Sequence, residues 1–394
     1  MTARRNLIAL TAIEGLLAVQ FWFPVWMIFL LDQGFSLNTI ALADGCFRVA
    51  VVISELPMGV LADRFGQRIA YLWLALLTLF TFVGAAFVQS TWQVMVIWFL
   101  WGIQWAAASG LGSAVLAELA STGRLAVGLH RAWSRVRAVS TATGAASLAF
   151  AGLLYQTDIR LPFLLTALAG GLILPLLLLL PAMPRHRVTS RSPWRTPDPR
   201  SLLPAGGAML LGIWVLTVAW TLVILYQPLA TELGIGAEGS ALMYVLYAVS
   251  GVLASALLST LPERFAPWAV GLGAVLMIGS TAAVGLWPDL GPVLWVPVIG
   301  AGFNLVWVTT EAWIGIKAPP HARSTAVSAA SFLSGVVMIG TRPGMVLVAE
   351  RWSAQFAFVI WAMLAVLFGG VLYLVWRLIR RLPNAAPSQP ETPS

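Results

Sequence analysis

The side chains that could do chemistry are ionisable groups placed inside long apolar stretches of the chain. A charged group at the centre of a lipid bilayer costs roughly 3 kcal/mol or more, so each one is a candidate functional residue. A carboxylate moved out of water tends to bind a proton, whereas a nearby arginine keeps it ionised. The candidate groups are Glu14, Asp44, Arg48, Glu55, Glu311 and Arg342.

The spacing of these groups indicates how some of them interact. Asp44 and Arg48 are four residues apart, which places them on one face of a helix, so we expect them to pair. We predict that Glu14, Asp44 and Arg48 form a proton-coupling or ligand-binding network. The alternative is a structural Asp44–Arg48 pair, with Glu14 as a polar residue in the wall of a cavity.

The remaining three charges lie nearer the ends of their stretches or stand alone. Glu55 lies seven residues beyond Arg48, near the same stripe. We expect Glu55 and Glu311 to act as gate or structural residues. Arg342 has three alternatives: it snorkels to the outer interface, it forms a structural pair, or it binds an anionic ligand.

The elements that must position these groups are membrane-spanning helices. Apolar residues make up 59% of the 394 residues and charged residues only 10%, against roughly a quarter charged in soluble proteins. A span needs about 20 apolar residues. Twelve such stretches fall near residues 7–31, 37–61, 69–88, 93–117, 136–156, 160–181, 205–229, 239–261, 268–287, 293–316, 324–348 and 355–379.

Basic residues give the expected orientation. If the N-terminus is cytoplasmic, Arg160 and Arg351 fall outside, Arg48 and Arg342 fall within spans, and the other 19 of the 23 (23 − 4) fall inside. The positive-inside rule therefore predicts that both termini are cytoplasmic, in the inner membrane of a bacterium. The net charge of +8 then serves insertion and contact with anionic lipid, and nucleic acid is not an expected partner.

Polar segments divide the chain into expected domains. Residues 182–204 are rich in arginine and proline and predict a cytoplasmic linker between bundles of six helices, 1–181 and 205–381. Residues 382–394 predict a disordered tail. A shift of 200 residues aligns LADRF at 61–65 with LPERF at 261–265, which is typical of two parallel halves with a ligand site between them.

The sequence offers little sign of an enzyme or of a bound cofactor. It contains no phosphate-binding loop, no H-E-x-x-H and no nucleophile elbow. Its histidines, at positions 130, 186 and 321, fall in expected loops without metal-ligand spacing, and the lone Cys46 is expected to pack inside a helix. We therefore expect no enzymatic activity, no cofactor and no metal.

One motif carries a family resemblance. Residues 59–68 read GVLADRFGQR, in the expected cytoplasmic loop after the second span. This segment resembles the G-x-x-x-D-R-x-G-x-R signature of the Major Facilitator Superfamily. The preceding ELPMG at 55–59 and RSTAVS at 323–328 resemble a bacterial branch of that family. The resemblance implies an all-α membrane transporter with twelve helices in two pseudo-symmetric bundles of six.

The resemblance also implies a latch at the cytoplasmic face. Asp63 would face the N-terminus of the eleventh span, while Arg64 and Arg68 would pair with Glu118 or with lipid phosphate. Gly59 and Gly66 would permit a close approach and a tight turn. The alternative is a basic loop that only sets topology.

Two other family motifs are missing. The arginine pattern of the fourth span, R-x-x-Q-G, retains only Gly102, and the antiporter signature of the fifth span is absent from residues 144–152. Both losses argue against a typical drug–proton antiporter.

By resemblance, spans one, four, seven and ten line the substrate cavity. The implied wall residues are Gln20, Trp22, Trp26, Gln104, Trp105, Ser109, Trp214, Trp220, Tyr226, Gln227, Asn304, Trp307 and Glu311. We expect a monomer that exports a small organic molecule in exchange for protons or another ion. The alternatives are an importer or uniporter, and a non-transporting sensor or scaffold on the same fold.

Overall fold

The computed structural model describes residues 2–108, 111–180, 199–318 and 323–381, and within these segments regular structure is helical with no strand. Ten helices there are long and apolar enough to cross a membrane. The first predicted span and the sixth, 160–181, are represented by shorter helices. The predicted all-helical membrane fold is therefore confirmed.

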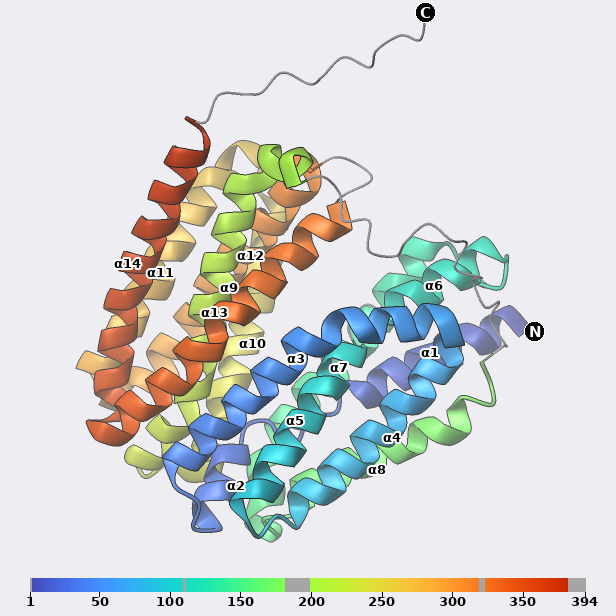
Figure 1. Cartoon of the computed structure of the whole chain (residues 1–394), viewed down its shortest axis with the longest axis horizontal. Helices are drawn as coiled ribbons and strands as arrows, with labels where there is room; N and C mark the ends of the chain where they lie inside the picture. The colour runs from blue at the N-terminus through green and yellow to red at the C-terminus, as the bar shows by residue number, and fades with distance from the viewer. Residues whose placement is uncertain (1, 109–110, 181–198, 319–322, 382–394) are drawn as a thin grey trace, which may run out of the picture.

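The helices form two groups, on opposite sides of Figure 1. The first group holds α1 (Thr2–Leu17), α2 (Trp26–Asp32), α3 (Leu37–Phe65), α4 (Gln67–Ala86), α5 (Thr91–Ala108), α6 (Leu111–Ser121), α7 (Leu129–Thr157) and α8 (Leu161–Leu176). The second group holds α9 (Gly206–Glu232), α10 (Gly236–Thr260), α11 (Ala266–Leu286), α12 (Val296–Lys317), α13 (Arg323–Arg351) and α14 (Ala354–Ile379).

The two groups meet where α3 packs on α13, α7 on α10 and α2 on α9. Helices α3 and α13 run antiparallel, because Gly45 lies against Pro343 and Val52 against Gly335. The two helices diverge toward the ends that carry Phe65 and Arg323 (Figure 1). We call this the basic end of the molecule, and the opposite end, where α3 begins and α13 finishes, the sealed end.

Helices α7 and α10 approach each other closely at one glycine. A Cβ built on Gly152 would lie 2.7 Å from the Cα of Glu238 and 3.1 Å from the carbonyl oxygen of Ala237. Both atoms belong to the backbone, so neither can move aside as a flexible side chain would. A glycine at position 152 therefore allows the two groups to meet toward the sealed end.

The first predicted span, 7–31, is wrong as a continuous helix. Residues 18–25 interrupt it, leaving α1 and α2 on either side. Pro24 has no N–H and disfavours helical geometry at the preceding Phe23. The N–H of Gln20 is donated instead to the hydroxyl of Ser147 on α7, at 2.9 Å.

The signature segment 59–68 is not the loop that its sequence predicts. Helix α3 continues through Phe65, so most of the segment is helical, and only Gly66 separates α3 from α4. Gly66 has a φ of 90°, which a residue with a Cβ adopts only under strain. This glycine therefore turns the chain within a single residue.

Candidate functional site

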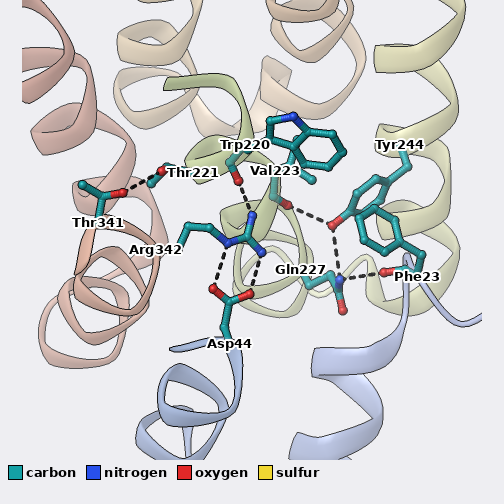
Figure 2. Close-up of polar contacts among 9 residues, drawn as sticks. All are labelled: Phe23, Asp44, Trp220, Thr221, Val223, Gln227, Tyr244, Thr341 and Arg342. Carbon is teal, nitrogen blue, oxygen red and sulfur yellow. Dashed lines mark hydrogen bonds and ion pairs between the residues drawn. The ribbon is translucent and has the colours of Figure 1, made fainter. Parts of the chain in front are cut away.

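A buried ion pair joins the two helix groups (Figure 2). The guanidinium of Arg342 on α13 donates from Nε to Oδ2 of Asp44 at 2.8 Å and from Nη2 to Oδ1 at 2.6 Å. Its third nitrogen, Nη1, donates to the carbonyl oxygen of Trp220 on α9. Asp44 is 0% exposed and Arg342 4%.

This geometry corrects two sequence-based expectations. The partner of Asp44 is Arg342 and not Arg48, although Arg48 lies one turn away on the same helix. Of the three alternatives for Arg342, structural pairing is the one observed, and the side chain does not snorkel to an interface. The facing helix α13 brings two guanidinium nitrogens of Arg342 within hydrogen-bond distance of both carboxylate oxygens.

Arg48 has one buried guanidinium nitrogen without a hydrogen-bond partner among the described residues. The side chain is 9% exposed, and its Nε has no hydrogen-bond partner in the described part of the chain. Its Cζ atom lies 5.0 Å from the ring centroid of Phe47. Asp44 attracts it and Arg342 repels it, because both are close enough to interact electrostatically.

Arg48 lines a cavity of about 330 Å³ between the two helix groups. Its wall runs along α3 from Phe47 to Glu55 and along α13 from Arg342 to Val327. Because these segments lead away from the ion pair toward Phe65 and Arg323, the cavity lies on the basic-end side of that pair. Volumes of this size are typical of small-molecule sites.

An aromatic wall crosses this cavity from one helix group to the other. Phe47 of α3 stacks on Trp101 of α5 with ring centroids 3.7 Å apart. Trp101 meets Trp105 edge-on at 6.2 Å, and Trp105 meets Trp220 of α9 edge-on at the same distance. The sequence indicates Trp105 and Trp220 as wall residues, but it does not single out Phe47 and Trp101.

A second cavity of about 350 Å³ shares Trp101 and Trp105 with the first. Its other lining residues include Gln20, Trp22 and Gln104, all three predicted as cavity residues. The Gln104 side chain donates from Nε2 to the hydroxyl of Thr78 at 3.2 Å. The described cavities thus include one between the helix groups that is lined in part by ionisable side chains. A second one, within the first group, is lined by uncharged side chains.

The break in the first span is held by side chains of the second helix group. Gln227 of α9 accepts from the N–H of Met27 at 2.7 Å. It also donates to the carbonyl oxygen of Phe23 at 3.0 Å (Figure 2). Ser240 of α10 donates to the carbonyl oxygen of Pro24 at 2.5 Å. These contacts supply partners that the interrupted helix lacks, and they close the sealed end.

Tyr244 completes this seal. Its hydroxyl accepts from Gln227 Nε2 at 3.2 Å and donates to the carbonyl oxygen of Val223 at 2.9 Å. The sequence indicates Gln227 as a cavity residue but does not indicate Ser240 or Tyr244. A proline inside an apolar stretch is the available signal, because it leaves backbone groups that need partners elsewhere.

Several expected wall residues pack inside one helix group instead. Trp26 contacts Trp98, Tyr226 stacks on Phe358, and the Trp214 indole donates to the carbonyl oxygen of Ala365 at 2.8 Å.

The remaining expected wall residues also lie outside the linings of these two cavities. Asn304 accepts from Ser255 of α10 at 3.3 Å, Trp307 packs on the apolar core and Glu311 is exposed. Ser109 lies outside the described residues.

Glu14 has its own environment within the first helix group. The hydroxyl of Tyr71 on α4 donates to its carboxylate, and Gly112 of α6 lies against the same carboxylate. Arg137 of α7 is close enough to interact with it electrostatically. Glu14 and Asp44 thus have different partners, and only Asp44 has its partner in the other helix group.

The latch residues are described only in part. The side chains of Asp63 and Arg64 and the surroundings of Gly59 lie outside the described residues, so their contacts stay a prediction. Arg68 lies in the first turn of α4, and Glu118 lies on α6 with its side chain half-buried.

Comparison with known proteins identifies the family. The sequence model of the Major Facilitator Superfamily matches residues 8–341. The chain belongs to the Major Facilitator Superfamily. Residues of this transporter are also 25% identical, over 155 positions, to the uncharacterized MFS-type transporter YxaM of Bacillus subtilis (strain 168). That match spans 39% of this chain and 38% of the relative.

Solved structures share the fold of this transporter. The nucleoside transporter NupG has a TM-score of 0.72 at 15% identity, with 95% of this chain and 99% of that chain covered. A bacterial homologue of the lysosomal transporter Spinster, inward-facing and unoccupied, has a TM-score of 0.74 at 16% identity, covering 96% and 98%. A D-xylose–proton symporter has a TM-score of 0.67 at 15% identity, covering 94% and 97%.

Proposed function

We propose that this transporter exports a small organic molecule across the cytoplasmic membrane of a bacterium in exchange for protons. The observation that carries the proposal is the cavity between the two helix groups, bounded on one side by the Asp44–Arg342 pair. A site placed between two halves can be exposed to either side of the membrane in turn as the halves rock. We assign the moving halves to residues 1–181 and 205–381, joined by the linker 182–204.

The orientation rests on the basic residues. Arg4, Arg124 and Lys317 lie at or beside helix ends and are among the 19 residues that the positive-inside rule places in the cytoplasm. With the basic end cytoplasmic, the cavity lies on the cytoplasmic side of the ion pair, and the seal of Gln227, Ser240 and Tyr244 closes the outer side. The arrangement is then an inward-facing state.

Asp44 is the residue that we propose for proton coupling. Its carboxylate belongs to one half and its guanidinium partner to the other, so neutralising the carboxylate weakens a contact between the halves. Proton occupancy and the position of the halves are then linked, as coupling requires. Glu14 is a weaker candidate, because its hydrogen-bond partner Tyr71 lies in the same half.

We propose that Asp63, Arg64 and Arg68 form a latch at the basic end, which is the end opposite to the seal of Gln227, Ser240 and Tyr244. In the inward-facing arrangement α3 and α13 diverge at the basic end, where this segment lies. The latch would form when the halves close there and the transporter faces outward. The basic residues of that end also provide contacts for anionic lipid, and we propose that the protein acts as a monomer.

Transport by the purified chain in liposomes tests the proposal. A pH-sensitive dye is trapped inside, a proton gradient is imposed, and pooled small organic molecules are screened for substrate-dependent proton flux. We expect flux in the unmodified protein, at least tenfold less flux in Asp44→Asn, and flux within about threefold of the unmodified protein in Glu14→Gln. The tenfold loss of rate corresponds to about 1.4 kcal/mol in the activation free energy of the slowest step.

Other outcomes separate the alternatives. Uptake of a labelled compound without proton flux would indicate a uniporter or another coupling ion. Flux that is accelerated when protons and substrate move in the same direction would indicate an importer. Binding without movement of any compound in either direction would indicate a sensor or scaffold and would refute the proposal.

A further inference from the structure

The buried charges beside the ion pair do not cancel; Glu55, the other carboxylate of the cavity, is half-buried and lies seven residues from Arg48 along α3. Arg48 and Arg342 provide two guanidinium groups beside a single buried carboxylate, Asp44, which is fully engaged by Arg342. A buried guanidinium nitrogen without a hydrogen-bond partner is costly, because it has lost water and gained no acceptor in return. The site is therefore built to gain free energy when an anion enters beside Arg48.

The second cation of the cluster is not available for this role. All three donor nitrogens of Arg342 that carry N–H groups have partners, two on Asp44 and one on Trp220. Arg48, in contrast, lines the cavity and has a buried Nε without a partner among the described residues. Carboxylate and phosphate groups both match the two-pronged donor face of a guanidinium, and of the two a carboxylate carries only a single negative charge.

The aromatic wall indicates what the rest of the ligand is like. Phe47 lies under the Arg48 guanidinium at 5.0 Å, and the wall continues through Trp101, Trp105 and Trp220. Flat, electron-rich faces at the edge of a cavity favour stacking or edge contacts with another aromatic ring. A ring held against this wall can therefore place a carboxylate, attached through a short linker, at Arg48.

Glu55 limits the choice further. It lines the same cavity seven residues from Arg48 along α3, a rise of about 10 Å. A second negative charge on the ligand would be repelled at that end of the cavity. The site therefore favours one negative group at Arg48 and an uncharged body.

We infer that the central cavity binds an aromatic monocarboxylate, with its carboxylate on Arg48 and its ring against Phe47, Trp101, Trp105 and Trp220. This inference names the substrate class of the proposed transporter, and so it rests on the proposed function for its biological meaning. Binding, however, is measured without transport.

Three matched probes test this inference on the full-length chain purified in detergent. They are 2-naphthylacetate, its neutral amide 2-naphthylacetamide, and the cationic 2-(2-naphthyl)ethylamine, which share one ring system and differ in charge. Titration calorimetry measures the affinity of each. We expect the acetate to bind at least tenfold more tightly than the amide or the amine, a ratio that corresponds to about 1.4 kcal/mol.

Two variants assign the preference to Arg48. Arg48→Gln should bring the affinities of the acetate and the amide within about twofold of each other, because both then meet a neutral side chain. Arg48→Lys keeps the charge but not the forked geometry, and should retain part of the preference. The folding of each variant is compared with that of the unmodified protein by thermal unfolding and gel filtration. If Arg48→Gln does not fold, the test relies on the acetate-to-amide affinity ratio of Arg48→Lys.

The wall is tested by Trp105→Leu, which should weaken 2-naphthylacetate more than cyclohexylacetate. The inference is overturned if the amide or the amine binds as tightly as the acetate, if none of the three probes binds, or if the preference survives in Arg48→Gln. Binding of the acetate without any flux in liposomes would refute the proposed function and leave this site intact. Proton-linked flux of other compounds, with no preference for carboxylates, would support the proposed function and refute this binding site.

Discussion

Asp44 and Arg342 lie 298 residues apart in the sequence and form two hydrogen bonds, of 2.8 and 2.6 Å, in the interior of the molecule. This pair connects α3 with α13 and, through the carbonyl oxygen of Trp220, with α9. It joins the two helix groups at the boundary between the central cavity and the sealed end. Its removal should therefore affect both stability and the balance between conformations.

Removing one member of the pair should destabilise the protein strongly. Arg342→Gln leaves the Asp44 carboxylate buried without its cation, and breaking a buried pair in this way typically costs about 3–5 kcal/mol. Asp44→Asn combined with Arg342→Gln leaves no uncompensated charge on either side of the pair. Thermal unfolding in detergent should show a smaller loss for the double variant than for the sum of the single ones, whereas additive losses would mean that the pair does not interact.

The pair should also hold the inward-facing arrangement. Ser331 lines the cavity, so Ser331→Cys, made in a Cys46→Ser background, reports access from the cytoplasmic side. If Asp44→Asn removes about 1.4 kcal/mol of preference for this arrangement, the ratio of inward-facing to outward-facing molecules falls about tenfold. Labelling of the cysteine by a water-soluble maleimide should then slow in proportion to the loss of inward-facing molecules, by up to about tenfold. Glu232→Gln is the matched control, because Glu232 accepts from the N–H of Ala354 within the second helix group.

An unchanged labelling rate in Asp44→Asn would show that the pair does not bias the two arrangements. A faster rate would mean that the pair favours the arrangement in which the cavity is closed to the label, contrary to the prediction.

The seal should depend on Gln227. In Gln227→Ala the buried N–H of Met27 and carbonyl oxygen of Phe23 lose their partner, and each unsatisfied group costs about 1–3 kcal/mol. Hydrogen exchange in peptides covering residues 22–29 should then accelerate by about tenfold or more. Thr231→Ala is the control, since its hydroxyl donates to the backbone carbonyl oxygen of Gln227 within α9 at 3.1 Å and leaves the Gln227 side chain in place. Equal exchange in both variants would mean that Gln227 does not hold the break.

The close approach of α7 and α10 should depend on the absence of a side chain at position 152. In Gly152→Ala the new Cβ would meet the backbone of Glu238 at 2.7 Å, so the helices must separate. We expect a loss of about 1–3 kcal/mol, typical of an overpacked contact, measured by thermal unfolding. Gly340→Ala is the control, because a Cβ there meets no atom of the described residues within 4 Å. A Gly152→Ala protein as stable as the Gly340→Ala protein would contradict the contact.

Part of the site could be predicted from the sequence because charge in an apolar stretch is conspicuous. Asp44, Arg48, Glu55 and Arg342 all stand out in this way, and all four border the central cavity or its ion pair. The sequence did not determine which of these charged residues pair with each other. Helical spacing favoured Asp44 with Arg48, because the sequence reports which residues share a face of one helix and does not report what lies opposite that face.

The break at residues 18–25 shows a similar division. Hydropathy summed over a window finds an apolar stretch long enough to span a bilayer, and it is insensitive to whether each backbone group has a partner. Pro24 signalled a weak point in the helix. The partners that allow the chain to leave helical geometry, Gln227 and Ser240, lie some 200 residues further along the chain.

The sequence by itself determined the class of the molecule, because apolar length, sparse charge and the segment at 59–68 are local properties that need no folded partner. The sequence also places a glycine, Gly66, directly after the charged residues of that segment. The chain turns at this glycine with a φ of 90°. The tertiary structure alone decided that Arg342 neutralises Asp44, that Arg48 remains open to the cavity and that Phe47 and Trp101 join its wall. Those outcomes depend on which helices pack together, and packing between distant segments is set by the whole fold rather than by spacing along one helix.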